Sequence, residues 1–269
     1  MKDLLRTEHL SREDVELLLA TAADFAANPL RSATALANKS VAIYMTKPST
    51  RTRLASETAV AHLGGTPIFL RGDDLQLGRG ETIADTAKII SGFCDALLIR
   101  TFAQADVDEL GAHASIPVIN GLTDDDHPTQ LLADWVTIRE NFGTDISGRK
   151  FVYLGDGNNM THSWLIMGAI MGAHVVAATP SGKFAPDTKA IATAQAIAAK
   201  TGAIVEVTND PEAAAIVFQS GVPISMYGLD VFMRPTVGRE EATEMSKSDK
   251  PASQFAGSLA LGFMEQVRT

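Results

Sequence analysis

The sequence predicts an α/β protein with two parallel-sheet, three-layer α/β/α domains joined by a long helix. Short apolar runs with the length of buried strands alternate with longer segments of helical periodicity along most of the 269 residues. Hydrophobic residues make up 45% of the chain and charged residues 20%, which is typical of a globular protein with a full core. Gly143 to Lys150 interrupts the alternation, so we expect one domain over residues 1–145 and another over residues 146–269.

The elements of the first domain can be justified in order. Ser11 is a good N-cap for a first helix, in which Val15, Leu18 and Phe25 share one face. Gly64-Gly65 marks the end of a helix that begins near Ser49. Strands are predicted at residues 41–45, 67–70, 96–100 and 117–122, and further helices at 80–93, 104–112 and 127–142.

The second domain repeats the alternation. Strands are predicted at residues 151–154, 174–178 and 204–207, with helices at about 160–172 and 186–201 between them. The remainder, residues 211–269, has the pattern of a helix, a strand and two helices, which could complete an α/β domain.

Charge, cysteine content and hydropathy limit the classes of function. The net charge of −9 argues against a broad basic face for nucleic acid. A lone cysteine, Cys94, cannot form an internal disulfide framework. The N-terminal residues lack the apolar run of a signal peptide, and no window has the length needed to span a membrane. We therefore expect a cytoplasmic protein that binds neither nucleic acid nor membranes.

A polar loop follows the first predicted strand at Ser49–Arg53 (Ser-Thr-Arg-Thr-Arg). Backbone N–H groups at the start of a helix attract anions, and hydroxyl groups add donors. The planar guanidinium of Arg51 can bind two phosphate oxygens at once. The loop thus predicts a phosphate or phosphate ester site at Ser49, Thr50, Arg51 and Thr52. The simpler alternative is a capped helix with solvated arginines.

Two more polar groups stand where predicted strands end, and such ends share one edge of a parallel sheet. Arg100 closes an apolar strand, and His127-Pro128-Thr129-Gln130 opens a helix after another strand. His127 and Gln130 are one helical turn apart, so the histidine can donate to a carbonyl oxygen while the glutamine holds a planar amide. The alternative is an exposed histidine on a helix capped by Asp126. Together with the loop, the two groups predict a single anion site.

Cofactor motifs are missing from the sequence. Gly155–Asn159 (Gly-Asp-Gly-Asn-Asn) lacks the third glycine of the dinucleotide fingerprint. No Gly-x-x-x-x-Gly-Lys-Ser/Thr loop occurs, and His127 has no neighbouring ligand at a usual zinc spacing. We therefore expect no cofactor and no metal. Asn159, at a helix start, is a candidate to bind a small polar substrate.

Over about residues 1–210, these motifs together resemble the aspartate/ornithine carbamoyltransferase family, and its ornithine branch most closely. The loop at residues 49–53 is similar to the family's carbamoyl phosphate loop. His127–Gln130 is similar to its His-Pro-x-Gln motif, and Arg100 matches the arginine that also meets carbamoyl phosphate. Leu154–Asn159, followed by His162-Ser163, matches the ornithine branch.

The resemblance implies cofactor-free carbamoyl transfer from carbamoyl phosphate to the side-chain amine of ornithine, a reaction of arginine biosynthesis that gives citrulline and phosphate. Residues 1–145 would bind carbamoyl phosphate, and residues 146–269 the amino acid. Gln76 stands where the family sends a residue into the next subunit's site, which implies a trimer-based homo-oligomer. The implied catalytic residues are Arg51, Arg100, His127 and Gln130. The implied substrate-binding residues are Ser49, Thr50, Arg51, Thr52, Gln76, Arg100, His127, Gln130 and Asn159.

The family pattern ends near Asp210. The ornithine branch continues with an Asp-x-x-x-Ser-Met segment, a His-Cys-Leu-Pro loop and a late arginine, which residues 211–269 lack in that arrangement. Asp210–Ala215 and Phe218–Val231 instead resemble the late part of nucleoside hydrolases, which predicts a rearranged or chimeric chain. Two alternatives to carbamoyl transfer follow. One is a carbamoyl phosphate binder without turnover. The other is a nucleoside hydrolase, which the absence of an aspartate-rich calcium motif disfavours.

Overall fold

The computed structural model describes residues 2–75, 80–146, 149–208, 243 and 247. Met1–Val217 form one compact unit, to which the features below belong. Gln76 and almost all of residues 211–269 lie outside the described residues. The predicted role of Gln76, the elements of the tail and its resemblance to nucleoside hydrolases therefore remain predictions.

The chain begins with a short 3-10 turn, η1 (Thr7–His9), and the helix α1 (Arg12–Ala27). The predicted N-cap of α1 is confirmed, since the Ser11 hydroxyl oxygen accepts from the backbone N–H of Asp14 at 3.0 Å. The Asp14 carboxylate in turn accepts from the backbone N–H of Ser11 at 3.1 Å, which completes a capping box.

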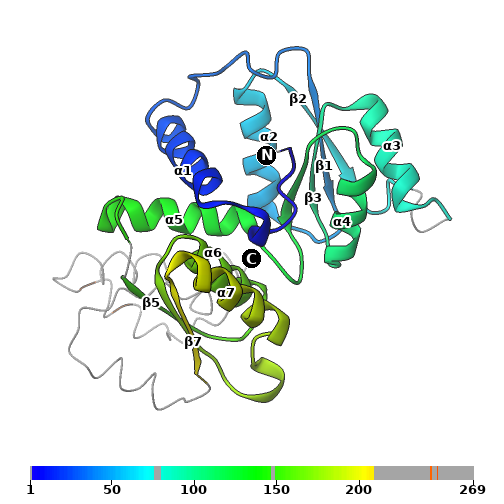
Figure 1. Cartoon of the computed structure of the whole chain (residues 1–269). Coiled ribbons are helices and arrows are strands. Elements are labelled where there is room, and N and C mark those ends of the chain that lie inside the picture. Colours follow the sequence, from blue (N-terminus) through cyan, green and yellow to red (C-terminus); the bar gives the residue numbers. More distant parts are fainter. Residues whose placement is uncertain (1, 76–79, 147–148, 209–242, 244–246, 248–269) are drawn as a thin grey trace. The chain divides into compact units, whose positions relative to one another are not determined.

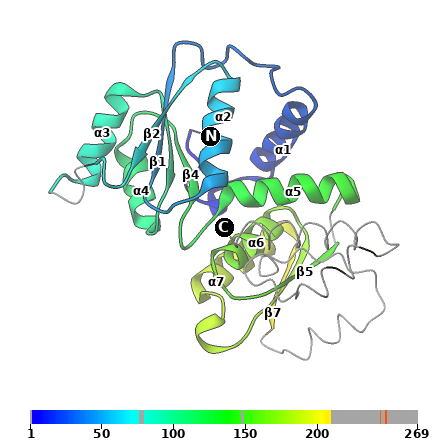
Figure 2. The ribbon, with the colours of Figure 1, turned by 180° about the vertical axis from the view of Figure 1, so that it is seen from behind.

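The first sheet contains four parallel strands, in the order β2-β1-β3-β4. Helices α3 and α4 lie on one side of this sheet and α2 on the other (Figure 1), and the reverse view agrees (Figure 2). The predicted parallel, layered arrangement is therefore confirmed for this part. The strands are β1 (Ser40–Met45), β2 (Thr66–Arg71), β3 (Ala96–Arg100) and β4 (Val118–Leu122), and the helices are α2 (Thr50–His62), α3 (Ile83–Phe93) and α4 (Gln104–His113).

The second sheet is also parallel, with the order β5-β6-β7. Its described helices, α6 and α7, pack against each other and against β7. Helix α6 approaches the sheet closely because Gly168 has no side chain to separate the helix from Val175 of β6. The strands are β5 (Lys150–Leu154), β6 (His174–Ala178) and β7 (Ile204–Thr208), and the helices are α6 (Asn159–Ile170), a short 3-10 turn η3 (Gly182–Phe184) and α7 (Thr188–Thr201).

Helix α5 (Pro128–Phe142) joins the two sheets in sequence and contributes to the core around α6. Its residues Leu131 and Trp135 are fully buried. The Trp135 ring lies 5.6 Å from that of Phe151 on β5 and 5.8 Å from that of Trp164 on α6. The predicted long joining helix therefore also forms part of the hydrophobic core that contains β5 and α6.

The observed helix ends follow their capping residues. Helix α3 begins at Ile83, not at the predicted Gly80, because the Thr82 hydroxyl accepts from the backbone N–H of Asp85. Helix α7 begins at Thr188 because Asp187 caps it. Among the described residues, no helix is long and apolar enough to cross a membrane.

The packing at Gly168 gives a first testable prediction. A methyl group at this position would meet Val175 Cγ2 at 1.9 Å. We therefore expect Gly168→Ala to lower the free energy of unfolding by about 1–3 kcal/mol, measured by urea denaturation. Gly92→Ala is the matched control, because Gly92 also lies in a helix but has nothing within 4 Å of the added methyl. It should be neutral or stabilising by up to about 1 kcal/mol. Equal stabilities of the two variants would contradict this packing.

Candidate functional site

The predicted anion loop lies between β1 and α2. Ser49 is the N-cap of α2, and its hydroxyl oxygen accepts from the backbone N–H of Thr52 at 3.2 Å. The Ser49 hydroxyl also donates to Thr52 Oγ1 at 3.0 Å. Thr50 and Arg51 are exposed in the first turn of the helix. The loop therefore places N–H groups and side-chain donors at one helix N-terminus, as an anion site requires.

Arg100 connects this loop to the end of β3. Its Nη1 donates to Thr52 Oγ1 at 3.2 Å, while its backbone carbonyl accepts from the N–H of Thr46 at 3.0 Å. Because Thr52 Oγ1 accepts from both Ser49 and Arg100, the proton of the Thr52 hydroxyl remains as a donor for a ligand. Arg100 Nε is buried and has no hydrogen-bond partner among the described residues. Burial lowers the pKa of Arg100, so this cation is partly desolvated.

His127 occupies the N-cap position of α5 and is half-buried. Burial lowers the pKa of His127 to about 4, and the positive charges of Arg100 and Lys47 add to the shift. The imidazole is therefore neutral at pH 7. Its Nδ1 lies 3.3 Å from the Thr129 hydroxyl. When Nδ1 accepts from Thr129, the ring carries its proton on Nε2 and can donate it to a carbonyl oxygen.

Gln130 lies one turn further along α5. Its Nε2 donates to Asp134 Oδ1 at 2.9 Å, which orients the amide. Oε1 is then the atom of this side chain that can accept a hydrogen bond from an amino group of a ligand. The predicted role of Gln130 toward a planar amide is compatible with this orientation.

Asn159 begins α6 and lies close to the loop after β4. Its Nδ2 donates to the backbone carbonyl of Thr123 at 2.7 Å, so its Oδ1 is the atom that can accept from a ligand. The backbone N–H of His127 donates to Ser163 Oγ, also on α6, at 3.0 Å. The loop that carries His127 and the first turns of α6 are therefore joined by direct hydrogen bonds.

The structure thus brings most of the predicted residues together. Direct contacts join Ser49, Thr52 and Arg100, and the electrostatic effect of Arg100 reaches His127. The side chain of Gln130 hydrogen-bonds Asp134, and its backbone N–H donates to the backbone carbonyl of His127 at 3.2 Å. Gln76 lies outside the described residues.

Lys47 is a site residue to which the sequence reasoning gave no role. Its Nζ forms an ion pair with Asp124 Oδ1 at 2.6 Å and lies 5.3 Å from the centroid of the Phe102 ring. Its charge also acts on His127. The available signal was its position, because a basic residue two positions before an anion loop at a strand end can face the same ligand.

Comparisons with known proteins agree with this geometry. The family model for the carbamoyl-P binding domain of aspartate/ornithine carbamoyltransferases matches residues 2–140. This chain belongs to the aspartate/ornithine carbamoyltransferase family. The family's Asp/Orn binding domain matches residues 147–219. This second match extends past Asp210, where the family pattern was predicted to end, and the resemblance of the tail to nucleoside hydrolases stays a prediction.

Several ornithine carbamoyltransferases are similar to this family member. That of Oceanobacillus iheyensis is 54% identical over 175 residues, which are 65% of this chain and 54% of the relative. That of Bacillus thuringiensis subsp. konkukian is 46% identical over 213 residues, 79% of this chain and 66% of the relative. The solved ornithine carbamoyltransferase from Pyrococcus furiosus has a TM-score of 0.75 at 46% identity, with 79% of this chain and 68% of that one covered. The chain therefore matches between about half and two thirds of the length of these curated relatives.

The neutral state of His127 makes the stability of this carbamoyltransferase family member depend on pH. The histidine pKa is about 4 in the folded protein against an ordinary 6.5, so between these values the unfolded chain binds the extra proton. We expect the free energy of unfolding to fall by roughly 2–3 kcal/mol as the pH drops from 6.5 to 4. This group should contribute no pH dependence above pH 7.

The measurement is chemical denaturation as a function of pH. His127→Gln should lose this part of the pH dependence, whereas His62→Gln, which changes an exposed histidine on α2, should keep it. The same slope in all three proteins would show that His127 is not held neutral by burial.

Proposed function

We propose that the protein transfers the carbamoyl group of carbamoyl phosphate to the δ-amine of ornithine, giving citrulline and phosphate in arginine biosynthesis. The observation that supports this most is the gathering of Thr52, Arg100 and His127 at one edge of the first sheet. An anion site beside a neutral hydrogen-bond donor suits an acyl phosphate, which carries a phosphate and a polarisable carbonyl. Membership of the family supports the same reaction class.

In this proposal the phosphate binds Ser49, Thr50, Arg51, Thr52 and Arg100. The carbonyl oxygen accepts from Thr52, Arg100 and His127, while Gln130 Oε1 accepts from the carbamoyl amino group. The amine nitrogen forms a bond to the carbonyl carbon, the carbon–oxygen bond to phosphate breaks, and one amine proton is released. Phosphate leaves with the bonding electron pair, and the negative charge is already matched by donors.

The positive charges also favour a reactive acceptor. Only a neutral amine has the lone pair that attacks the carbonyl carbon. Lys47, Arg51 and Arg100 surround the reaction site with positive charge, which disfavours the protonated form of an amine placed there. The site would therefore bind an anion and activate an amine with the same set of cations.

The acceptor is assigned to the second part of the chain. Asn159 Oδ1 can accept from an α-ammonium group, because Nδ2 of the same side chain is used by Thr123. We therefore assign carbamoyl phosphate binding to residues 1–145 and amino acid binding to residues 146–269. The predicted cytoplasmic location belongs to this proposal as well.

The experiment is a turnover assay of the purified chain with carbamoyl phosphate and ornithine, putrescine or aspartate as acceptor. Citrulline formation with ornithine is the expected result. Absence of product with all three acceptors would reject the proposed transfer. Titration calorimetry with phosphate then tests the alternative of a binder without turnover.

Arg51 provides the variant for the binding measurement. Loss of charge-assisted hydrogen bonds in Arg51→Ala should weaken phosphate binding about ten- to hundredfold. Arg53→Ala is the matched control, because Arg53 Nε donates to Glu57 at 3.0 Å and its guanidinium lies 3.7 Å from the Phe69 ring centroid. Binding should be nearly unchanged in this control. Equal losses in the two variants would reject the assigned anion site.

The proposed assembly is a trimer in which Gln76 of one subunit completes the site of the next. Arg51→Ala and Gln76→Ala should each be nearly inactive alone. Mixing them before reassembly should restore activity, because a heterotrimer contains some sites with Arg51 from one subunit and Gln76 from its neighbour. Random equimolar mixing predicts activity of about a quarter of the unmodified level. No recovery in mixed trimers would reject a shared site.

A further inference from the structure

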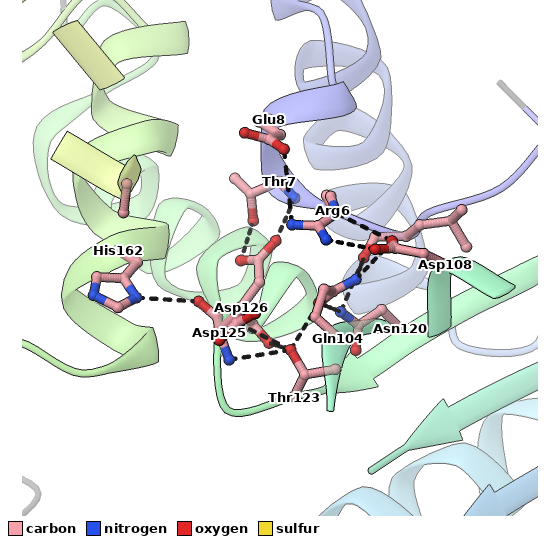
Figure 3. A network of polar contacts seen from close by, with 12 residues as sticks. Arg6, Thr7, Glu8, Gln104, Asp108, Asn120, Thr123, Asp125, Asp126 and His162 are labelled. Atoms are coloured by element: carbon pink, nitrogen blue, oxygen red, sulfur yellow. Dashed lines mark hydrogen bonds and ion pairs between the residues drawn. The ribbon is translucent and has the colours of Figure 1, made fainter. Parts of the chain in front are cut away.

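Asp126, directly before His127, is buried although it carries a carboxylate. Only 6% of its surface is exposed. It was a candidate N-cap for α5, but His127 occupies that position. The residue instead belongs to a network of polar contacts that also includes residues of the N-terminal segment, α4 and the loop after β4 (Figure 3). A buried carboxylate requires hydrogen-bond donors, so its partners indicate what it holds.

Three hydrogen bonds reach this carboxylate from two distant segments. Thr7 of η1 donates through its backbone N–H at 2.5 Å and through its hydroxyl at 2.7 Å. Ser163 of α6 donates through its hydroxyl at 2.5 Å. Burial raises the pKa of Asp126, and the donors from Ser163 and Thr7 oppose that shift. Asp126 therefore ties the N-terminal segment and α6 to the loop before His127.

Ser163 extends this connection to both predicted substrate sites. Its oxygen accepts from the backbone N–H of His127 at 3.0 Å, and it lies 2.8 Å from the backbone carbonyl of Asn159. One hydroxyl group thus contacts the residue that would polarise the carbonyl group and the residue that would bind the acceptor. Its rotation is fixed by the short bond to Asp126.

The loop before His127 is also held by hydrogen bonds within the loop and to neighbouring helices. Thr123 donates its backbone N–H to the carbonyl of Asp126 at 2.8 Å, and its hydroxyl donates to Gln104 at 2.7 Å. His162 Nδ1 lies 3.3 Å from the carbonyl of Asp125 (Figure 3). Since these bonds make the loop rigid, a change at Asp126 would be transmitted to the adjacent His127 rather than absorbed by the loop.

We propose that Asp126 is a positioning residue that acts through Ser163 to hold His127 at a fixed distance from Asn159. This proposal rests on the proposed carbamoyl transfer and deepens it. Asp126 itself would not touch either substrate. Its effect would be to place the carbonyl-polarising donor and the acceptor site at a fixed separation, as a reaction between two bound substrates requires.

The test compares Asp126→Ala, Asp126→Asn and a matched control, Asp108→Asn. Asp108 pairs with Arg6 at 2.5 Å and so holds the same N-terminal segment, and it also accepts from Gln104 at 3.2 Å. A rotated asparagine at position 126 can accept from the Thr7 N–H and donate to Ser163 Oγ, which keeps the geometry and removes the charge. The alanine variant removes both.

The first measurement follows the His127 imidazole by NMR as the pH is varied. In Asp126→Ala we expect the His127 midpoint to rise from about 4 to above about 5, as the ring leaves its buried position beside Arg100. Loss of the negative charge alone would lower the midpoint, so a rise reports displacement of the ring. Asp126→Asn and Asp108→Asn should both keep the midpoint at or below about 4.

The second measurement is turnover with ornithine. Asp126→Ala should lower kcat about ten- to hundredfold. Its phosphate affinity should stay within about twofold, because the bonds among Ser49, Thr52 and Arg100 do not involve Asp126. Asp126→Asn should restore most of the activity.

An unchanged His127 midpoint in Asp126→Ala would overturn the proposal, and so would equal effects of Asp126→Ala and Asp108→Asn. If Asp126→Ala does not fold, Ser163→Ala decides by the same criteria, since it breaks the link to His127 directly. If the unmodified chain turns over no acceptor, the carbamoyl transfer proposal fails. The NMR titration still decides whether Asp126 positions His127, because it requires no turnover.

Discussion

The register between β1 and β3 is the constraint on which the candidate site depends. Met45 pairs with Arg100, so the two strands end at the same level, and the loop after β1 hydrogen-bonds the Arg100 carbonyl. A shift against β4 between Ile99 and Arg100 then brings Leu122 opposite Arg100. The loop that carries His127 follows from that point. A slip of one residue would turn Arg100 to the other face of the sheet and separate these groups.

The charged groups at the candidate site are mainly positive, whereas the net charge of the chain is negative. The chain carries a net charge of −9, yet Lys47 and Arg100 meet a neutral histidine at the sheet edge. Asp124 partly compensates this positive charge through its ion pair with Lys47. A bound dianion would compete with Asp124 for that lysine. The arrangement keeps cations at the sheet edge when no anion is bound, without leaving Lys47 unpaired.

The sequence predicted the order and type of the described elements because their periodicity and caps are local signals. The start of α3 was predicted too early, at Gly80, because Thr82 was not recognised as the residue that caps the helix. The site residues on strand ends and helix starts were also predictable, since topology brings such positions together. The contact of Asp126 with Thr7 and Ser163 was not predictable, because it joins residues far apart in sequence with no periodic pattern between them. The position of Lys47 two residues before the anion loop was a signal for its role, whereas its ion pair with Asp124 joins residues far apart in sequence.

Helix α5 has a consequence for the order in which the protein can acquire its structure during synthesis. The first sheet is complete in sequence at Leu122, and α5 also packs against α1 and β4, but the two rings next to Trp135 belong to β5 and α6. In a nascent chain that has just released α5 from the ribosome, Trp135 would lack its contacts with Phe151 and Trp164. The first sheet and its anion loop would then be complete in sequence while α5 is only partly covered, until the next segment emerges.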